Sequence, residues 1–161
     1  MNPLEFHHEN QETILIVDDL KANLKLLTYI LGTDGYRTGF ALSGKEALET
    51  LIVASPDLPD LILLDLMMPD MNGIEVCQVI KSNPDYQDIP IIFLTASQEE
   101  HYLIEAFELG ASDYVTKPFR QPELLMRVKT QLTIKRQAQE IIKLNHELQE
   151  MRSSSLSCYV K

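Results

Sequence analysis

The chain has 161 residues, of which 45% are hydrophobic, and its formal net charge is −10 at neutral pH. This size and composition predict one domain with a full hydrophobic core and a smaller appendage. A chain this acidic lacks the cationic surface that neutralises phosphates, so no nucleic-acid partner is expected. No apolar run approaches the roughly 20 residues of a membrane span, and no signal peptide precedes the first run. We therefore expect no membrane partner and a cytoplasmic location.

The chain begins with a polar, aperiodic segment, residues 1–12, which we interpret as a flexible leader. Short apolar runs then alternate with segments of helical periodicity. Strands are expected at 14–17, 36–41, 61–65, 91–95 and 113–116. Helices are expected at about 20–31, 43–52, 73–80, 98–109 and 122–152. Strict alternation of this kind predicts an α/β fold in which helices cover both faces of a five-stranded parallel sheet.

Four of the five expected strands end in polar side chains. Asp18 and Asp19 follow the first run, Asp65 ends the third, Thr95 ends the fourth, and Lys117 follows the fifth. In an open α/β sheet, ligands bind outside the carboxyl ends of the strands. We therefore expect these five side chains to lie around one site.

Three carboxylates at one edge of the sheet repel one another in a partly dry site. They therefore require a cation to neutralise their charge. Oxygen ligands without histidine or thiolate select a hard metal, Mg²⁺ or Mn²⁺. A metal of this kind beside a lysine and a hydroxyl is typical of phosphoryl transfer, in which an aspartate can itself be the nucleophile. This chemistry explains why the apolar run 61–64 ends on the carboxylate of Asp65.

Each of these residues also has an ordinary structural interpretation. Asp18 and Asp19 together could cap a helix, because acidic residues favour helix N-termini. Asp65 could cap the loop before the third helix, and Lys117 could lie on the surface. Thr95 is an ordinary strand-end residue when it is considered alone. Their coincidence at the ends of neighbouring strands favours the site.

The segments ILIVDD, LILLDLMMPDMNG, PIIFLTA and DYVTKPF occur in this order, each at the end of an expected strand. Together they make residues 13–132 resemble the receiver domain of two-component response regulators, in the CheY-like superfamily. The resemblance implies a doubly wound, flavodoxin-like (βα)5 fold with strand order 2-1-3-4-5. It also implies a Mg²⁺-dependent phosphoprotein that accepts a phosphoryl group from a sensor histidine kinase and then switches protein contacts in signal transduction.

The resemblance assigns a role to each matching residue. Asp65 would be the phosphoacceptor, forming an aspartyl phosphate. Asp18, Asp19 and Asp65 would hold the metal together with the backbone carbonyl of Met67.

The resemblance also implies how the site responds. Lys117 would contact the phosphoryl group, and Thr95 would move toward it. Tyr114 would be the aromatic switch that follows Thr95, although a half-buried strand tyrosine is the ordinary interpretation. A cis peptide is implied at Lys117-Pro118. Gly73 would open the third helix from a loop conformation that other residues tolerate poorly.

A Mg²⁺-dependent phosphohydrolase of the haloacid dehalogenase kind is a competing class, because it also uses an aspartate nucleophile. Such enzymes carry an acid/base aspartate two residues after the nucleophile, and Met67 occupies that position here. A methionine cannot transfer protons, and the chain has no insertion that would enclose a substrate. We therefore expect self-phosphorylation and self-dephosphorylation of one aspartate, not turnover of an external substrate.

Helical periodicity continues past the resemblance, over residues 133–152. An a/d seam of the kind found in coiled coils is formed by Ile134, Gln137, Ile141, Leu144, Leu148 and Met151. We expect a parallel homodimer through residues 134–151, although a helix folded back on its own domain is an alternative. Residues 153–161 are expected to be a flexible tail.

Two other functions stay open. The chain could be a dimerising adaptor whose acidic site is silent. It could also be the N-terminal fragment of a larger protein in which the receiver controls an output domain such as a cyclase or a kinase.

Overall fold

The computed structural model describes residues 11–55, 57–96 and 101–158, and strands alternate with helices throughout. The elements are β1 (Thr13–Val17), α1 (Lys21–Thr33), β2 (Arg37–Ala41), α2 (Gly44–Ala54), β3 (Leu61–Asp65), α3 (Gly73–Ser82), β4 (Ile91–Thr95), α4 (His101–Glu108), β5 (Asp113–Thr116) and α5 (Gln121–Cys158). Each strand agrees with its predicted bounds to within one residue.

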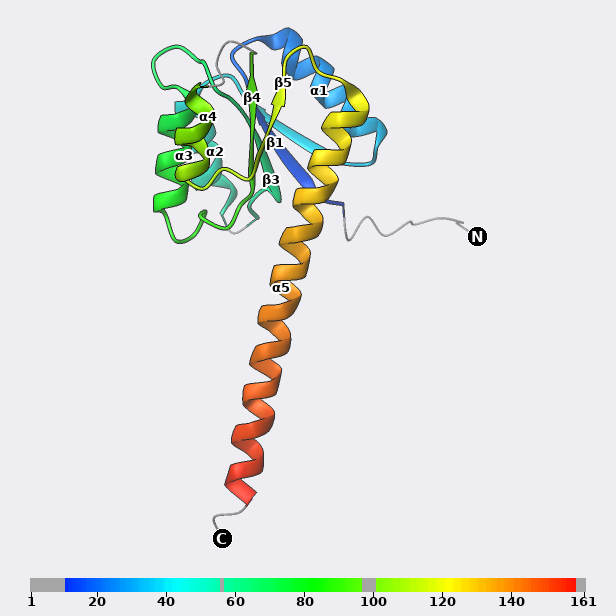
Figure 1. Ribbon diagram of the computed structural model, residues 1–161, viewed down its shortest axis with the longest axis vertical. Coiled ribbons are helices and arrows are strands. Elements are labelled where there is room, and N and C mark those ends of the chain that lie inside the picture. The colour runs from blue at the N-terminus through cyan, green and yellow to red at the C-terminus, as the bar shows by residue number, and fades with distance from the viewer. Residues whose placement is uncertain (1–10, 56, 97–100, 159–161) are drawn as a thin grey trace, which may run out of the picture.

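The five strands form one parallel sheet in the order β2-β1-β3-β4-β5, which confirms the predicted doubly wound α/β fold (Figure 1). The register places Val17 beside both Ala41 and Leu64, and it places Asp65 beside Leu94. The strands therefore end together at one edge. The residues that follow them can meet there without long excursions of the backbone.

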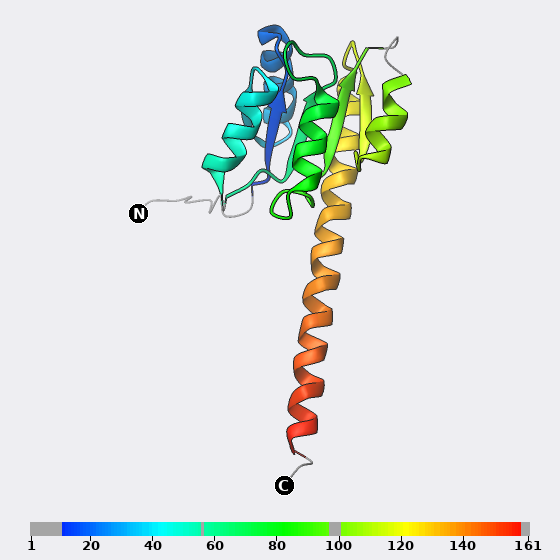
Figure 2. The same cartoon turned by 90° about the vertical axis from the view of Figure 1, so that its left-hand side faces the viewer.

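The core lies on both faces of the sheet, as the uninterrupted apolar runs of β1, β3 and β4 require. Helices α1 and α5 cover one face, around Ile16 and Leu63. Helices α2, α3 and α4 cover the other face, around Leu64 and Phe93 (Figure 2). Burial of each such side chain stabilises the fold by about 1.5–3 kcal/mol. The central strands are therefore firmly packed, and the residues at their carboxyl ends are held in fixed positions.

Helix α5 packs on the sheet through its first three turns and then projects away from it as one straight helix (Figure 1). Its buried contacts are made by Leu124, Val128 and Leu132. Residues 136–156 are all exposed. Lys135 lies 3.5 Å from the carboxylate of Asp60, and Arg136 donates to the carboxylate of Glu12 at 2.8 Å. These ion pairs fix the helix where it leaves the domain.

The C-terminal end of α5 differs from the prediction. The helix continues to Cys158, whereas the sequence predicted an end near Arg152 and a flexible tail at 153–161. The hydroxyls of Ser153, Ser154 and Ser155 donate to backbone carbonyls four residues earlier. The serines therefore satisfy their own polar groups within the helix and do not end it.

Two other predictions concern residues at the edge of the described structure. Most of the predicted leader 1–12, and residues 98–100 of the fourth predicted helix, lie outside the described residues. Glu12, at the end of that leader, is held in place. Its backbone carbonyl accepts from Arg37, and its side chain pairs with Arg136.

Among residues 11–55, 57–96 and 101–158, no helix combines the length and the apolar character that crossing a membrane requires.

Candidate functional site

The structure brings the predicted site residues together at the carboxyl edge of the sheet. Asp18 and Asp19 follow β1, Asp65 ends β3, and Lys117 follows β5. One carboxylate oxygen from each of the three aspartates lies within 4.8 Å of the others. Asp18 and Asp65 are buried and Asp19 is partly exposed, so the cluster opens to solvent on one side.

Asp18 is completely buried and is held by two groups at the start of α1. Its Oδ1 accepts from the backbone N–H of Leu20, and its Oδ2 accepts from the side-chain amide of Asn23, both at 2.9 Å. Leu20 occupies the N-cap position of α1 and makes no side-chain cap. The alternative that the aspartates cap this helix is therefore wrong, and the carboxylate of Asp18 is directed to the site.

Lys117 crosses the site from β5 and contacts two of the aspartates. Its ammonium donates to Oδ1 of Asp65 at 2.9 Å and lies 3.4 Å from Oδ2 of Asp18. Its backbone N–H donates to the carbonyl of Thr95 at 2.8 Å, and the bond to Pro118 is cis, as the resemblance implied. Lys117 therefore lies in the site and is not an ordinary surface lysine.

The charges at the site are unbalanced. Burial raises the pKa of Asp65 to about 7, the hydrogen bond from Lys117 opposes this rise, and the charge of Asp18 adds to it. Burial alone would lower the pKa of Lys117, but its hydrogen bonds and ion pairs with Asp65 and Asp18 outweigh burial and raise it. Three carboxylates face one ammonium, which is the charge distribution that a divalent cation would neutralise.

Thr95 and Tyr114 lie on adjacent strands beside the aspartates. Thr95 is completely buried, and its hydroxyl donates to the carbonyl of Ala96 at 2.9 Å. The register pairs Thr95 with Thr116 and Phe93 with Tyr114. Because side chains alternate along a strand, Tyr114 and Thr95 point to the same face of the sheet.

The ring of Tyr114 is half-buried between α4 and α5. It meets Phe107 edge to face, with ring centroids 6.2 Å apart. The guanidinium carbon of Arg127 lies 5.5 Å from the centre of the same ring, and Arg127 also donates to Asp113 at 2.8 Å. Tyr114 therefore links the strand beside the site to both helices that flank it.

The loop between β3 and α3 packs tightly against Asp65. Gly73 is the first residue of α3, and its backbone is not left-handed, so the reason predicted for this glycine was wrong. A Cβ at position 73 would collide with the backbone oxygen of Asp65 and come within 2.9 Å of the Phe93 ring. The glycine is required for this close approach.

Met67 lies two residues after Asp65 in the same loop, and its side chain is about half exposed. That its backbone carbonyl is a metal ligand stays a prediction.

Helix α3 is capped by Asn72 and Glu75, which form a reciprocal capping box. The alternative for Asp65 was a cap of the loop before this helix, and the structure instead engages its Oδ1 with Lys117.

Asn23 is the site residue that sequence reasoning missed. It lies in the first turn of α1, five residues after Asp18, and its amide donates to Oδ2 of that carboxylate. An asparagine in the first turn of an exposed helix is usually unremarkable. The signal that could have found it is its position one turn past two site aspartates.

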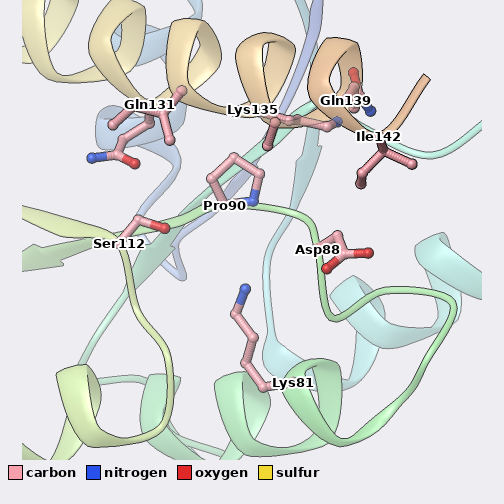
Figure 3. Close-up of a pocket in the computed structure, with 10 residues that line it drawn as sticks. Lys81, Asp88, Pro90, Ser112, Gln131, Lys135, Gln139 and Ile142 are labelled. Carbon is pink, nitrogen blue, oxygen red and sulfur yellow. The ribbon is translucent and has the colours of Figure 1, made fainter. Parts of the chain in front are cut away.

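A separate cleft of about 280 Å³ lies near the opposite end of the sheet, where α5 leaves the domain (Figure 3). Lys81, Asp88 and Pro90 line one side, and residues of α5 including Lys135 and Ile142 line the other. None of the predicted site residues lines it. The ammonium of Lys81 is engaged by the carbonyls of Gln87 and Ile89, both at 2.8 Å.

Comparison with curated proteins finds relatives over the receiver part of the chain. Response regulator PleD of Caulobacter vibrioides is 42% identical over 117 residues, which cover 73% of this chain and 25% of PleD. The phosphate regulon transcriptional regulatory protein PhoB of Rhizobium meliloti is 42% identical over 119 residues, which cover 74% of this chain and 51% of PhoB. The chain thus matches about half or less of the length of these relatives.

Solved structures share the same fold. The signal receiver domain of a signal transduction histidine kinase from Syntrophus aciditrophicus is 37% identical with a TM-score of 0.68, over 76% of this chain and 90% of that one. A CheY-like response regulator receiver domain protein from Methanospirillum hungatei is 26% identical with a TM-score of 0.73. The match covers 80% of this chain and 99% of that one. The family model of the response regulator receiver domain matches residues 14–129. The chain therefore belongs to the response regulator receiver family, whose role is phosphoryl acceptance in two-component signalling.

Proposed function

We propose that Asp65 is the phosphoacceptor of this receiver and that a sensor histidine kinase supplies the phosphoryl group. The observation that carries this proposal is the position of Asp65. It is a buried carboxylate at the end of a rigid central strand, with Oδ1 held by Lys117 and two more aspartates beside it. An oxygen of Asp65 attacks phosphorus, the phosphorus–nitrogen bond of the donor phosphohistidine breaks, and the freed imidazole takes up a proton.

The cofactor of this reaction is proposed to be Mg²⁺, or Mn²⁺ in its place. The three aspartates offer only oxygen atoms, which these hard cations prefer. Asp18, Asp19 and Asp65 would hold the ion together with the backbone carbonyl of Met67. When bound, the ion neutralises charge on the transferred phosphoryl oxygens.

The remaining site residues are proposed to read the phosphorylated state. The ammonium of Lys117 is positioned to exchange part of its contact with Asp65 for a phosphoryl oxygen. The hydroxyl of Thr95 would turn from the carbonyl of Ala96 to the phosphoryl group. Tyr114, on the same face of the sheet, would then move inward and change the surface formed by α4 and α5.

We further propose that the chain acts as a signalling protein and not as a turnover enzyme. Met67, at the position where an aspartate-dependent hydrolase carries its proton donor, has no group that transfers protons. A cytoplasmic location belongs to the proposal and is supported by the buried free thiol of Cys77. The proposed partners are the kinase and a second copy of the chain, joined through residues 134–151.

A second candidate, a dimerising adaptor with a silent acidic site, is favoured by the long exposed apolar stripe of α5. An output domain beyond the receiver, such as a cyclase or a kinase, is a third proposal. The chain matches 25% of PleD and 51% of PhoB, so the receiver in those proteins is joined to further sequence.

Intact-mass measurement after incubation with acetyl phosphate and Mg²⁺ tests the proposal. We expect one added phosphoryl group on the wild type and none on Asp65→Asn or after chelation of Mg²⁺. Asp70→Asn is the matched control, because Asp70 is an exposed aspartate of the same loop and should label normally. Labelling of Asp65→Asn would contradict the assigned acceptor, and an unlabelled wild type would favour the silent adaptor.

Asn23→Ala is expected to lower the affinity for Mg²⁺ about tenfold, because the amide of Asn23 orients the carboxylate of Asp18. Calorimetric titration of the unphosphorylated protein with Mg²⁺ measures this effect without any phosphoryl transfer. Asn145→Ala, an exposed asparagine on the projecting part of α5, is the control and should bind Mg²⁺ as the wild type does. Equal affinities for Asn23→Ala and the wild type would show that Asn23 does not position Asp18.

A further inference from the structure

The projecting part of α5 carries an exposed apolar stripe. Its large residues are 48–65% exposed in the chain, and they are Ile134, Ile141, Leu144, Leu148 and Met151. With Gln137, they recur at alternating intervals of three and four residues, which places them at the a and d positions of a heptad repeat. A single helix with such a stripe in water lacks the packing that stabilises most helices in proteins.

From Ile141 onward the stripe lies away from the receiver that carries it, whereas Ile134 also lines the cleft between α5 and the domain. Leu132 packs in the core, and Leu148, 16 residues later, is turned by about 160° from it at 3.6 residues per turn. Nearer the domain, the same side of α5 carries Glu123 and Arg127, which pair with each other at 3.3 Å. The apolar stripe therefore begins at Ile134, and its own domain does not cover it from Ile141 onward.

We propose that a second copy of the chain covers this stripe as a parallel, in-register coiled coil that begins at Ile134. The inference rests on the homodimer proposed above and adds its register and the charge pair, Glu147 with Arg152, that selects its parallel orientation. It places both Asp65 sites at the same end of the dimer.

The charges beside the stripe select the parallel orientation. In a parallel pair, Glu147 at position g faces Arg152 at position e of the partner helix, and the pair occurs twice by symmetry. Within the described part of the chain, Glu147 and Arg152 take part in no ion pair, so both can pair across the dimer. In an antiparallel pair centred on the stripe, Glu140 would face Glu147 of the partner, and two like-charge contacts would form.

Two exposed apolar residues outside the stripe do not offer a competing seam. Ile142 and Leu156 occupy position b, and the residues between them on that side are Asn145, Gln149 and Arg152. Ile142 lines the cleft between α5 and its own receiver, together with Lys81 and Pro90 (Figure 3). Gln137 is the polar d residue of the stripe, and pairing two Gln137 amides favours the in-register alignment.

Cysteine cross-linking of the full chain tests the orientation. In a Cys158→Ser background, Met151→Cys places a thiol at a d position and Ser153→Cys places one at the outward f position. Cys77 is buried and does not compete. We expect mild oxidation to link Met151→Cys chains into a disulfide dimer and to leave Ser153→Cys chains unlinked. An antiparallel pair centred on the stripe would separate the two 151 positions by about 26 Å, at 1.5 Å per residue, and would form no link.

Charge reversal tests the pairing of Glu147 with Arg152. Glu147→Arg is expected to weaken dimerisation about tenfold in sedimentation equilibrium, and adding Arg152→Glu should restore most of the affinity. A monomer at micromolar concentration would overturn the dimer. Disulfide linkage of Ser153→Cys chains would overturn the parallel register. A dimerisation affinity that Glu147→Arg leaves unchanged would overturn it as well. None of these outcomes alters the expected phosphorylation of Asp65, so the two proposals fail separately.

Discussion

Asp65→Asn is expected to stabilise the metal-free protein by about 3 kcal/mol near pH 8, although it removes the proposed phosphoacceptor. The reason is the position of the carboxylate, which is 3% exposed and shares its site with Asp18 and Asp19. An asparagine of nearly the same shape carries no charge and can still accept the hydrogen bond from Lys117. The charged aspartate is kept at a cost to stability because the chemistry of the site requires it.

The dependence of this effect on pH follows from the direction of the pKa shift. Burial raises the pKa of Asp65 from 3.8 to about 7. Below pH 3.8 the carboxyl is protonated in both the folded and the unfolded chain, so its full contribution to stability is present. That contribution is lost as the pH rises through about 7, since the unfolded chain ionises first. About three pKa units correspond to about 4 kcal/mol, and the weaker bond between Lys117 and asparagine reduces the difference.

Urea unfolding of both proteins across this pH range, with a chelator present, measures the difference. The difference in the free energy of unfolding between Asp65→Asn and the wild type should disappear as the pH falls toward 4. Mg²⁺ should stabilise the wild type more than the variant, because it binds the folded site. Asp70→Asn is the control. Its difference from the wild type in the free energy of unfolding should not follow the same pH profile. A variant less stable than the wild type at pH 8 would mean that the Lys117 ion pair outweighs the burial of Asp65.

The strands and the site could be predicted from sequence because both depend on local patterns. An apolar run of four or five residues bounded by polar residues marks a strand buried on both faces, and its last residue marks the carboxyl edge. Asp65, Thr95 and Lys117 are therefore located once the strands are located. The parallel sheet then brings them together without further information.

What sequence did not predict depends on contacts between elements or on the balance of weak preferences. The amide of Asn23 matters only because α1 turns it toward Asp18. Three serines were interpreted as the start of a tail, yet their hydroxyls bond within α5, and the helix continues to Cys158. The reason for Gly73 was wrong because the space around a glycine is a property of the folded chain.

Gly73→Ala is expected to lower the free energy of unfolding by about 3 kcal/mol or more. The added Cβ would collide with the backbone oxygen of Asp65 and approach the Phe93 ring to 2.9 Å. Neither neighbour can move freely, since one is main chain of a central strand and the other is a completely buried ring. The backbone N–H of Gly73 also donates to the carbonyl of Leu66 at 2.8 Å, so relieving the collision would strain this bond.

Gly32→Ala is the matched control, because α1 holds Gly32 with no other atom within 4 Å of an added Cβ. The same chemical change should there raise stability by about 0.5–1 kcal/mol, through the better helix propensity of alanine. Urea unfolding at one pH compares the two variants directly. If Gly73→Ala lowers the free energy of unfolding by less than about 1 kcal/mol, the loop after β3 can shift to accommodate the added Cβ. A large loss would show that the backbone carrying Asp65 is fixed by close packing, which is the rigidity that aiming a nucleophile at phosphorus requires.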